Sequence, residues 1–152
     1  MGASLSPTNA RIVLVADDDE NDVLLLRRAF QKADLSHTIV HVKDGQGVID
    51  YLAGVGANTK PSPGLLLLDL KMPLLDGFDV LAWLRNQPER LPMPVVVFSS
   101  SGLPKDKAKA ETLGADDYLV KPDNFDSWIL VAKKLHEQWL DGDRSVARTK
   151  VE

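Results

Sequence analysis

The sequence contains no cysteine, which excludes disulfide bonds, thiol catalysis and cysteine metal sites, and fits a reducing compartment. It has no run of about 18 apolar residues, the length that a membrane-spanning helix requires. It also lacks an excess of basic residues: the formal charge is −4, whereas binding to a phosphate backbone depends on clustered Lys and Arg. We therefore expect a cytoplasmic protein that binds neither membrane nor nucleic acid.

Signal-peptide and nucleotide-binding patterns are missing as well. The segment 1–9 is small and polar, without the basic and then apolar pattern of a secretory signal. The pattern GxxxxGK[ST] of a nucleotide-binding P-loop does not occur. The 152 residues allow one domain with a proper core. We predict a flexible leader at 1–9, one domain at 10–141 and a polar tail at 142–152.

Short apolar runs alternate with helical patterns along the chain. The runs predict strands at 11–16, 38–42, 65–68, 94–98 and 117–120. Helical spacing predicts helices at 20–33, at 48–54, from 78 to about 86, at 104–114 and through 128–139. This alternation predicts an α/β fold, a flavodoxin-like (βα)5 doubly wound parallel sheet with strand order 2-1-3-4-5.

Four leucines at 65–68 end on a single carboxylate, Asp69. A uniform apolar run is typical of a strand buried on both faces, and ligands bind at the carboxyl ends of such strands. The expected strand order brings polar residues from several strand ends to the same pocket. These residues are Asp17, Asp18, Asp69, Ser99 and Lys121.

Three neighbouring carboxylates repel one another, and a hard divalent cation such as Mg²⁺ relieves that repulsion. A metal and Lys121 can then neutralise phosphoryl oxygens while a carboxylate attacks phosphorus, and Asp69 is the best placed nucleophile. The blander interpretation of the acidic run 17–19 is helix capping alone. His37 and His41 have no partner at a metal-ligand or triad spacing, so we interpret them as strand or surface residues.

These features together resemble a response-regulator receiver domain, the phosphoacceptor of two-component signalling. The resemblance covers about Arg11 to Leu140. It is carried by Asp17-Asp18, the leucine strand with Asp69, Lys71-Met-Pro73 with Asp76-Gly77, Ser99-Ser100, Gly114-Ala115 and Tyr118-Leu-Val-Lys121-Pro122.

The resemblance implies a role for each matching residue. Asp69 is the phosphorylated residue, and Lys121 pairs with the phosphoryl group. The implied ligands of Mg²⁺ are Asp17, Asp18, Asp69 and the Lys71 backbone carbonyl. The Lys121–Pro122 peptide is expected to be cis. Ser99 and Tyr118 are the implied switch pair, which alters the surface formed by the helix at 104–114, the strand at 117–120 and the last helix.

A closer similarity concerns the segment DENDVLLLRR at 19–28, the loop 56–63, the register KPDNF at 121–125, and Trp139. These are similar to single-domain regulators that pair with phytochrome-type or hybrid histidine kinases. The implied partners are a histidine kinase, a histidine phosphotransfer protein and a second copy of the chain. Such a protein promotes its own phosphorylation and dephosphorylation and is not otherwise an enzyme.

Two other classes stay open at this point. A haloacid-dehalogenase-like phosphatase also attacks from an Asp at a strand end, but it requires a second Asp two residues later, where this chain has Lys71. A phosphorylation-independent interaction module is expected to lack part of the site, and here every member is present. Tyr118 can also be a plain packing residue of its strand.

Overall fold

The computed structural model describes residues 10–88 and 92–141. Within that part, five parallel strands form one sheet in the order β2-β1-β3-β4-β5. The strands are β1 (Ile12–Ala16), β2 (Thr38–Val42), β3 (Leu65–Leu68), β4 (Val95–Ser99) and β5 (Asp117–Val120). The helices are α2 (Glu20–Lys32), α3 (Gly45–Gly56), α4 (Gly77–Arg85), α5 (Pro104–Thr112) and α6 (Phe125–Leu135), and the π-helix η2 (His136–Leu140) follows α6 directly. The predicted flavodoxin-like architecture is confirmed.

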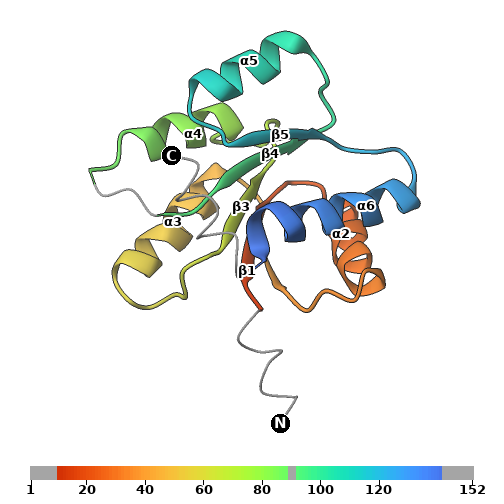
Figure 1. The fold of residues 1–152 in the computed structure, drawn as a ribbon. Coiled ribbons are helices and arrows are strands. Elements are labelled where there is room, and N and C mark those ends of the chain that lie inside the picture. The colour runs from red at the N-terminus through yellow and green to blue at the C-terminus, as the bar shows by residue number, and fades with distance from the viewer. Residues whose placement is uncertain (1–9, 89–91, 142–152) are drawn as a thin grey trace.

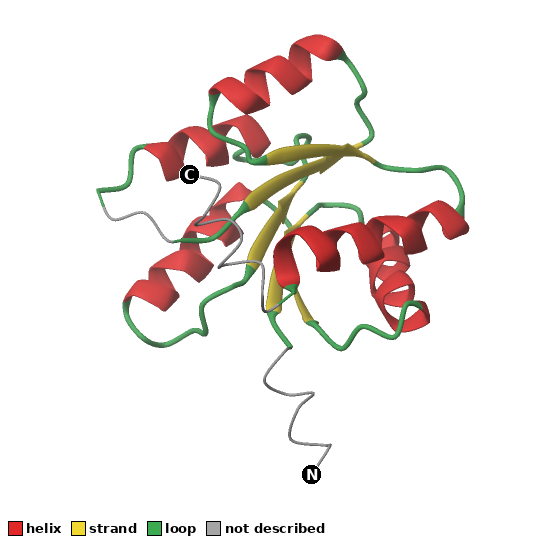
Figure 2. Cartoon of the chain, in the orientation of Figure 1, coloured by secondary structure: helices red, strands yellow, loops and turns green. Residues whose placement is uncertain are grey.

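The helices lie in two layers, one on each face of the sheet (Figure 1, Figure 2). Helices α2 and α6 lie next to each other on one face, and α3, α4 and α5 cover the other. Each layer buries its own hydrophobic cluster against the sheet. Both faces of the central strands are therefore shielded from water.

Strand β3 explains the four consecutive leucines. Leu65 and Leu67 belong to the cluster beneath α2 and α6, whereas Leu66 and Leu68 belong to the cluster on the opposite face. Because side chains alternate between the faces of a strand, a central strand of a parallel sheet has no polar side. Each leucine is at most 1% exposed, so β3 is a rigid base for the residue that follows it.

Short polar side chains begin several helices. Asp19 caps α2, Asp44 caps α3 and Asn124 caps α6, each accepting a hydrogen bond from a backbone N–H of the first turn. Asp76 begins α4 with a capping box, in which Asp79 reaches back to the Asp76 N–H. These caps fix where the helices start relative to the strand ends, where the predicted pocket lies.

Helix α3 runs to Gly56, so the predicted end at Gly54 was wrong. After the helix the chain folds back on Gly54, whose carbonyl accepts from the N–H groups of Thr59 and Lys60 at 2.8 and 3.1 Å. A Cβ at position 54 would lie 2.5 Å from Lys60 Cγ. Gly54 therefore permits a close approach of the chain and does not stop the helix.

The last helix also differs from the single helix predicted. It widens at His136 into η2, where the Asp141 N–H donates to the His136 carbonyl at 2.7 Å. Trp128 and Leu135 are buried beneath the helix, and Trp139 packs against the same cluster. These two tryptophans of the last helix therefore belong to its hydrophobic packing.

The predicted leader (1–9) and tail (142–152) lie outside the described residues, so those two boundaries remain predictions. Across the described ranges, no helix is both long and apolar enough to cross a bilayer.

Candidate functional site

Three aspartates meet at the carboxyl edge of the sheet. Asp17 and Asp18 follow β1, and Asp69 follows the neighbouring strand β3, whose last residue pairs with Ala16. The Asp69 N–H continues that ladder by donating to the Ala16 carbonyl at 2.9 Å. One carboxylate oxygen of each aspartate lies within 4.8 Å of the others. Asp17 and Asp69 are buried and Asp18 is exposed, so the cluster opens to solvent on the Asp18 side.

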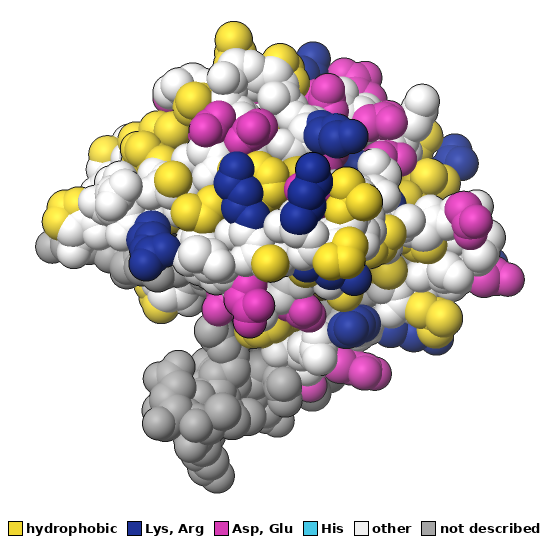
Figure 3. All heavy atoms as spheres, turned by 90° about the horizontal axis from the view of Figure 1, so that it is seen from above, with side chains coloured by type: hydrophobic (Ala, Val, Ile, Leu, Met, Phe, Trp, Pro, Cys, Tyr) yellow, Lys and Arg dark blue, Asp and Glu magenta, His cyan; other side chains and the backbone are white. Residues whose placement is uncertain are grey.

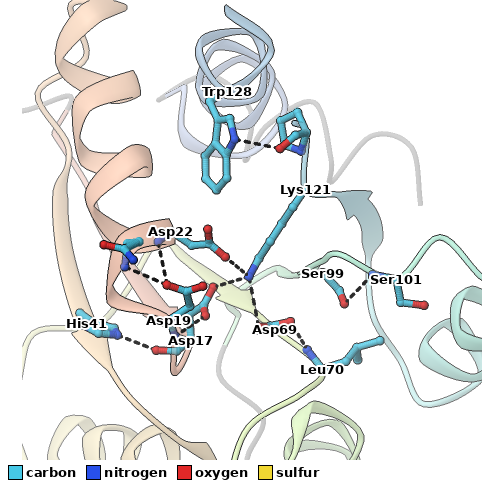
Figure 4. A network of polar contacts seen from close by, with 12 residues as sticks. Asp17, Asp19, Asp22, His41, Asp69, Leu70, Ser99, Ser101, Lys121 and Trp128 are labelled. Atoms are coloured by element: carbon cyan, nitrogen blue, oxygen red, sulfur yellow. Dashed lines mark hydrogen bonds and ion pairs between the residues drawn. The ribbon is translucent and has the colours of Figure 1, made fainter. Parts of the chain in front are cut away.

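Lys121 enters the same cluster from the end of β5 (Figure 4). Its Nζ donates to Asp17 Oδ2 at 2.8 Å and to Asp69 Oδ2 at 3.2 Å. A third hydrogen bond, 2.7 Å long, runs to Oδ2 of Asp22 in the first turn of α2. Asp22 was not predicted as a site residue, because nothing in its spacing distinguishes it from other acidic residues at a helix start.

Burial and the neighbouring charges both shift the pKa values of the cluster. Burial raises the pKa of Asp17 to about 6, and Lys121 offsets only part of that effect. Burial alone would lower the pKa of Lys121, but hydrogen bonds to Asp17 and Asp22 and the charge of Asp69 raise it above its ordinary value. Lys121 therefore stays charged.

Backbone groups orient the two buried carboxylates. Asp17 Oδ1 accepts from the Asp19 N–H at 2.9 Å, and Asp69 Oδ1 accepts from the Leu70 N–H at 2.8 Å. In each case the second oxygen, Oδ2, faces Lys121. His41 on β2 adds a contact that was not predicted, since its Nε2 donates to the Asp17 carbonyl at 2.7 Å. His41 is a strand residue, as we interpreted it from the sequence, and the pairing of β2 with β1 brings its ring to the Asp17 carbonyl.

Gly77 shows why the motif Asp76-Gly77 follows the acceptor strand. A Cβ at position 77 would lie 2.4 Å from the Asp69 carbonyl oxygen and 2.8 Å from Leu70 Cα. The start of α4 therefore packs directly against the backbone that carries Asp69, and only glycine leaves room for it. The Gly77 N–H donates to the Leu70 carbonyl at 2.9 Å and fixes that approach.

The donor set suits a hard divalent cation. Asp17, Asp18 and Asp69 offer carboxylate oxygens, which are the ligands that Mg²⁺ prefers, and an open side leaves space for water and phosphate oxygens. Lys71, whose carbonyl is the fourth predicted ligand, follows Asp69 by two residues and is exposed. Its role in metal binding remains a prediction.

Ser99 and Tyr118, the predicted switch pair, are joined through Ser101. The buried Ser99 Oγ accepts from the Ser101 N–H at 3.2 Å, and the Tyr118 hydroxyl donates to the Ser101 carbonyl at 2.7 Å. The Ser101 hydroxyl donates to Asp106 Oδ2 in the first turn of α5 at 2.5 Å. Ser101 was not singled out from the sequence, and it links the pocket to both Tyr118 and α5.

The predicted cis peptide between Lys121 and Pro122 was wrong, since all described peptide bonds are trans. Trans is the intrinsically favoured isomer even before proline, and Lys121 reaches the carboxylates from it. The loop that follows is held by Trp128, whose Nε1 donates to the Pro122 carbonyl at 3.1 Å. The Trp128 ring in turn packs edge-on against Phe98, with the ring centroids 5.2 Å apart.

Residues 13–132 match the family described as the response regulator receiver domain. The chain belongs to that family. Receiver domains bind Mg²⁺ or Mn²⁺ at an acidic pocket and interact with histidine kinases or phytochromes, and this chain has an acidic cluster formed by Asp17, Asp18 and Asp69. The resemblance inferred from the motifs is thereby confirmed.

The structures of several proteins similar to this receiver domain have been solved. Response regulator Rcp1 of Synechocystis is 27% identical over 132 residues, which cover 86% of this chain and 90% of Rcp1. The Mn²⁺-bound form of Rcp1 superposes with a TM-score of 0.75 over 87% of this chain and 96% of that one.

Two further structures agree with the predicted similarity to phytochrome-associated regulators. RPA3017, which acts in red light signalling of R. palustris, is 34% identical, with a TM-score of 0.78 over 86% of this chain and 94% of its own. The phosphorylated cyanobacterial phytochrome response regulator RcpA is 31% identical, with a TM-score of 0.77 over 86% of this chain and 94% of its own.

Proposed function

We propose that this receiver domain accepts one phosphoryl group on Asp69 from the phosphohistidine of a histidine kinase and later loses it to water. The observation that supports this most strongly is the meeting of one buried ammonium and three aspartates around the end of β3. A buried carboxylate with cationic neighbours and an open side is an acceptor site for an anionic group.

The chemistry at Asp69 is a displacement at phosphorus. A carboxylate oxygen forms a P–O bond while the P–N bond to the kinase imidazole breaks, and the imidazole keeps the electron pair. In the second step, water attacks phosphorus and releases a proton to solvent, the P–O bond to Asp69 breaks with its electron pair returning to the carboxylate, and inorganic phosphate leaves. Neither step requires an organic substrate in the pocket.

The residues around Asp69 have different roles. Lys121 neutralises one phosphoryl oxygen. Asp17, Asp18, Asp69 and the Lys71 carbonyl hold Mg²⁺, which when bound supplies positive charge to the other phosphoryl oxygens. Leu70 N–H keeps the Asp69 carboxylate in one orientation. Lys71 is exposed two residues after Asp69. Its side chain can shade the attacking water and so lengthen the life of the phosphorylated state.

The output follows from the contacts of Ser101. When the Ser99 hydroxyl turns toward a phosphoryl oxygen, the hydrogen bond from the Ser101 N–H to Ser99 changes. The Ser101 carbonyl accepts the hydrogen bond of the Tyr118 hydroxyl, so a movement of Ser101 also affects Tyr118. Helix α5 is tied to it through Asp106. Phosphorylation therefore shifts the surface of α5, β5 and α6, where a partner protein docks.

Phytochrome-type or hybrid histidine kinases are the partners we propose, because several similar structures are phytochrome response regulators. A histidine phosphotransfer protein presents the same phosphohistidine chemistry and is a further partner for phosphorelay.

The test is chemical labelling by acetyl phosphate with Mg²⁺, followed by intact-mass measurement. We expect one added phosphoryl group on the unmodified chain and none on Asp69→Asn, which removes the nucleophilic oxygen while keeping the side-chain shape. Asp76→Asn is the matched control, because asparagine caps α4 as well as aspartate does. An equal mass increase in Asp69→Asn would assign the phosphoryl group to another residue and reject the proposal.

A further inference from the structure

The ammonium of Lys121 has three N–H donors, and three carboxylates take them. The shortest contact, 2.7 Å, is to Asp22, and the longest, 3.2 Å, is to Asp69. The Lys121 ammonium therefore lies closer to Asp22 of α2 than to the acceptor Asp69. Its side chain is only 9% exposed. A buried ammonium is costly without such partners, so each contact contributes to keeping the charge in the pocket.

The three carboxylates are not equivalent. Asp17 and Asp69 belong to the group that offers oxygens to a cation, and their remaining oxygens already accept backbone hydrogen bonds. The carboxylates of Asp17 and Asp69 therefore have to serve a backbone N–H, the lysine and any cation. Asp22 lies outside the metal-ligating group found in the described chain. Its carboxylate can serve Lys121 alone.

The position of Asp22 suits this separate role. It lies in the first turn of α2, whose start is fixed by Asp19, and the Asp22 N–H donates to the Asp19 carbonyl at 3.1 Å. Asp22 and Lys121 also line a cavity of about 360 Å³ together with Phe125 and Trp128. The Asp22 side chain is 23% exposed, against 5% for Asp17, so it holds the ammonium from the solvent side.

We propose that Asp22 is a positioning residue, the dedicated counter-ion that holds Lys121 in place while Asp17 and Asp69 turn their oxygens to a cation and a phosphoryl group. The proposal rests on the proposed function, because it concerns how the same pocket is kept ready. Without Asp22, Lys121 depends on Asp17 and Asp69 alone and competes with the cation for their oxygens. Asp22 is thus expected to favour metal binding without being a ligand.

The experiment compares Asp22→Asn with Asp19→Asn, a control that removes the same charge at the start of the same helix. Asparagine at position 19 retains the cap of α2, and the Asp19 side chain makes no hydrogen bond to Lys121 among those described. Mg²⁺ affinity is measured by titration calorimetry. We expect Asp22→Asn to weaken Mg²⁺ binding about fivefold or more and Asp19→Asn by no more than about twofold. The smaller effect is expected because water and salt screen the interaction between an exposed charge and the bound cation.

A second readout follows Lys121 directly. A buried, hydrogen-bonded ammonium exchanges its protons slowly enough for nitrogen-15 NMR, and we expect Asp22→Asn to speed that exchange while Asp19→Asn leaves it unchanged. Asp22→Glu keeps a carboxylate and is expected to recover most of the Mg²⁺ affinity. It also preserves the test if Asp22→Asn does not fold, which circular dichroism reports.

Equal Mg²⁺ affinities for Asp22→Asn and Asp19→Asn, with unchanged ammonium exchange in both, would overturn the proposal. Neither measurement involves phosphorylation. If acetyl phosphate fails to label the unmodified chain, the proposed function fails, while the two measurements still decide whether Asp22 holds Lys121.

Discussion

Leu74 is a single residue whose backbone and side chain are both unusual. It lies in the loop between β3 and α4 with φ at 69°, in the left-handed region, and its side chain is 81% exposed. A left-handed conformation costs a residue with a Cβ roughly 1–2 kcal/mol, and asparagine and glycine tolerate it better. An exposed leucine recovers little of that cost by burial, so the residue lowers the stability of the loop beside Asp69.

Leu74→Asn is therefore expected to raise the free energy of unfolding by about 0.5–1 kcal/mol, measured by urea denaturation. Leu74→Ala is the control, because it removes the same exposed side chain but keeps a residue that pays the full backbone cost. If Leu74→Ala stabilises the protein as much as Leu74→Asn does, side-chain exposure and not backbone conformation is the cause.

The site residues show what a sequence can predict at this scale. Asp17, Asp69 and Lys121 each follow a strand, and in a parallel sheet the ends of neighbouring strands meet at one edge. Asp22 and Ser101 follow no such rule. Their roles depend on which way a helix turn or a loop faces, and that is fixed by packing against distant parts of the chain.

At the scale of elements, a pair of histidines joins the start of β2 to η2. His37 Nδ1 accepts from the Arg11 N–H at 2.9 Å, so a neutral His37 carries its proton on Nε2. That nitrogen lies 2.9 Å from Nδ1 of His136 and donates to it, which requires His136 Nδ1 to be unprotonated. The sequence did not predict this contact, since His136 is brought to His37 only by the packing of the last helix.

This arrangement predicts a loss of stability in acid. Burial, and then the charges of His136 and Arg11, lower the pKa of His37 from 6.5 to about 4. Between these two values the unfolded chain binds a proton that the folded protein does not, so stability is full above about pH 6.5 and falls as the pH drops toward 4.

His37→Asn, which cannot take up a proton, should remove this contribution. We expect the unmodified protein to lose about 1–2 kcal/mol more than the variant between pH about 7.5 and about 5, measured by urea unfolding at both values. Equal losses in the two proteins would mean that His37 titrates alike in the folded and unfolded states.

At the scale of the whole molecule, the surface of α5, β5 and α6 is where we predict self-association. In Figure 3, which views the molecule from the α5 side, basic and acidic side chains alternate with hydrophobic ones. Strand β5 is at the edge of the sheet, and Val120 on it is 40% exposed. A face that carries both signs of charge can complement a second copy of itself about a twofold axis.

We therefore expect beryllofluoride with Mg²⁺, which mimics the phosphoryl group, to increase dimerisation through this surface, measured by light scattering. Val120→Glu should weaken the dimer, because it places a charge in the centre of the interface. Leu24→Glu on α2, where the leucine is 45% exposed, is the matched control and should have no effect. A monomer at high concentration with and without beryllofluoride would contradict dimerisation.

The sequence by itself determined the strand order and the membership of the acidic pocket, because hydrophobic periodicity defines each strand and strand ends converge in a parallel sheet. Tertiary structure alone decided the Lys121–Asp22 and His37–His136 contacts. The two residues of each pair are 99 positions apart, and both contacts join the first part of the chain, α2 or the start of β2, to its last part, the end of β5 or η2. Such contacts depend on how the last elements pack against the first ones in three dimensions, which no local pattern records.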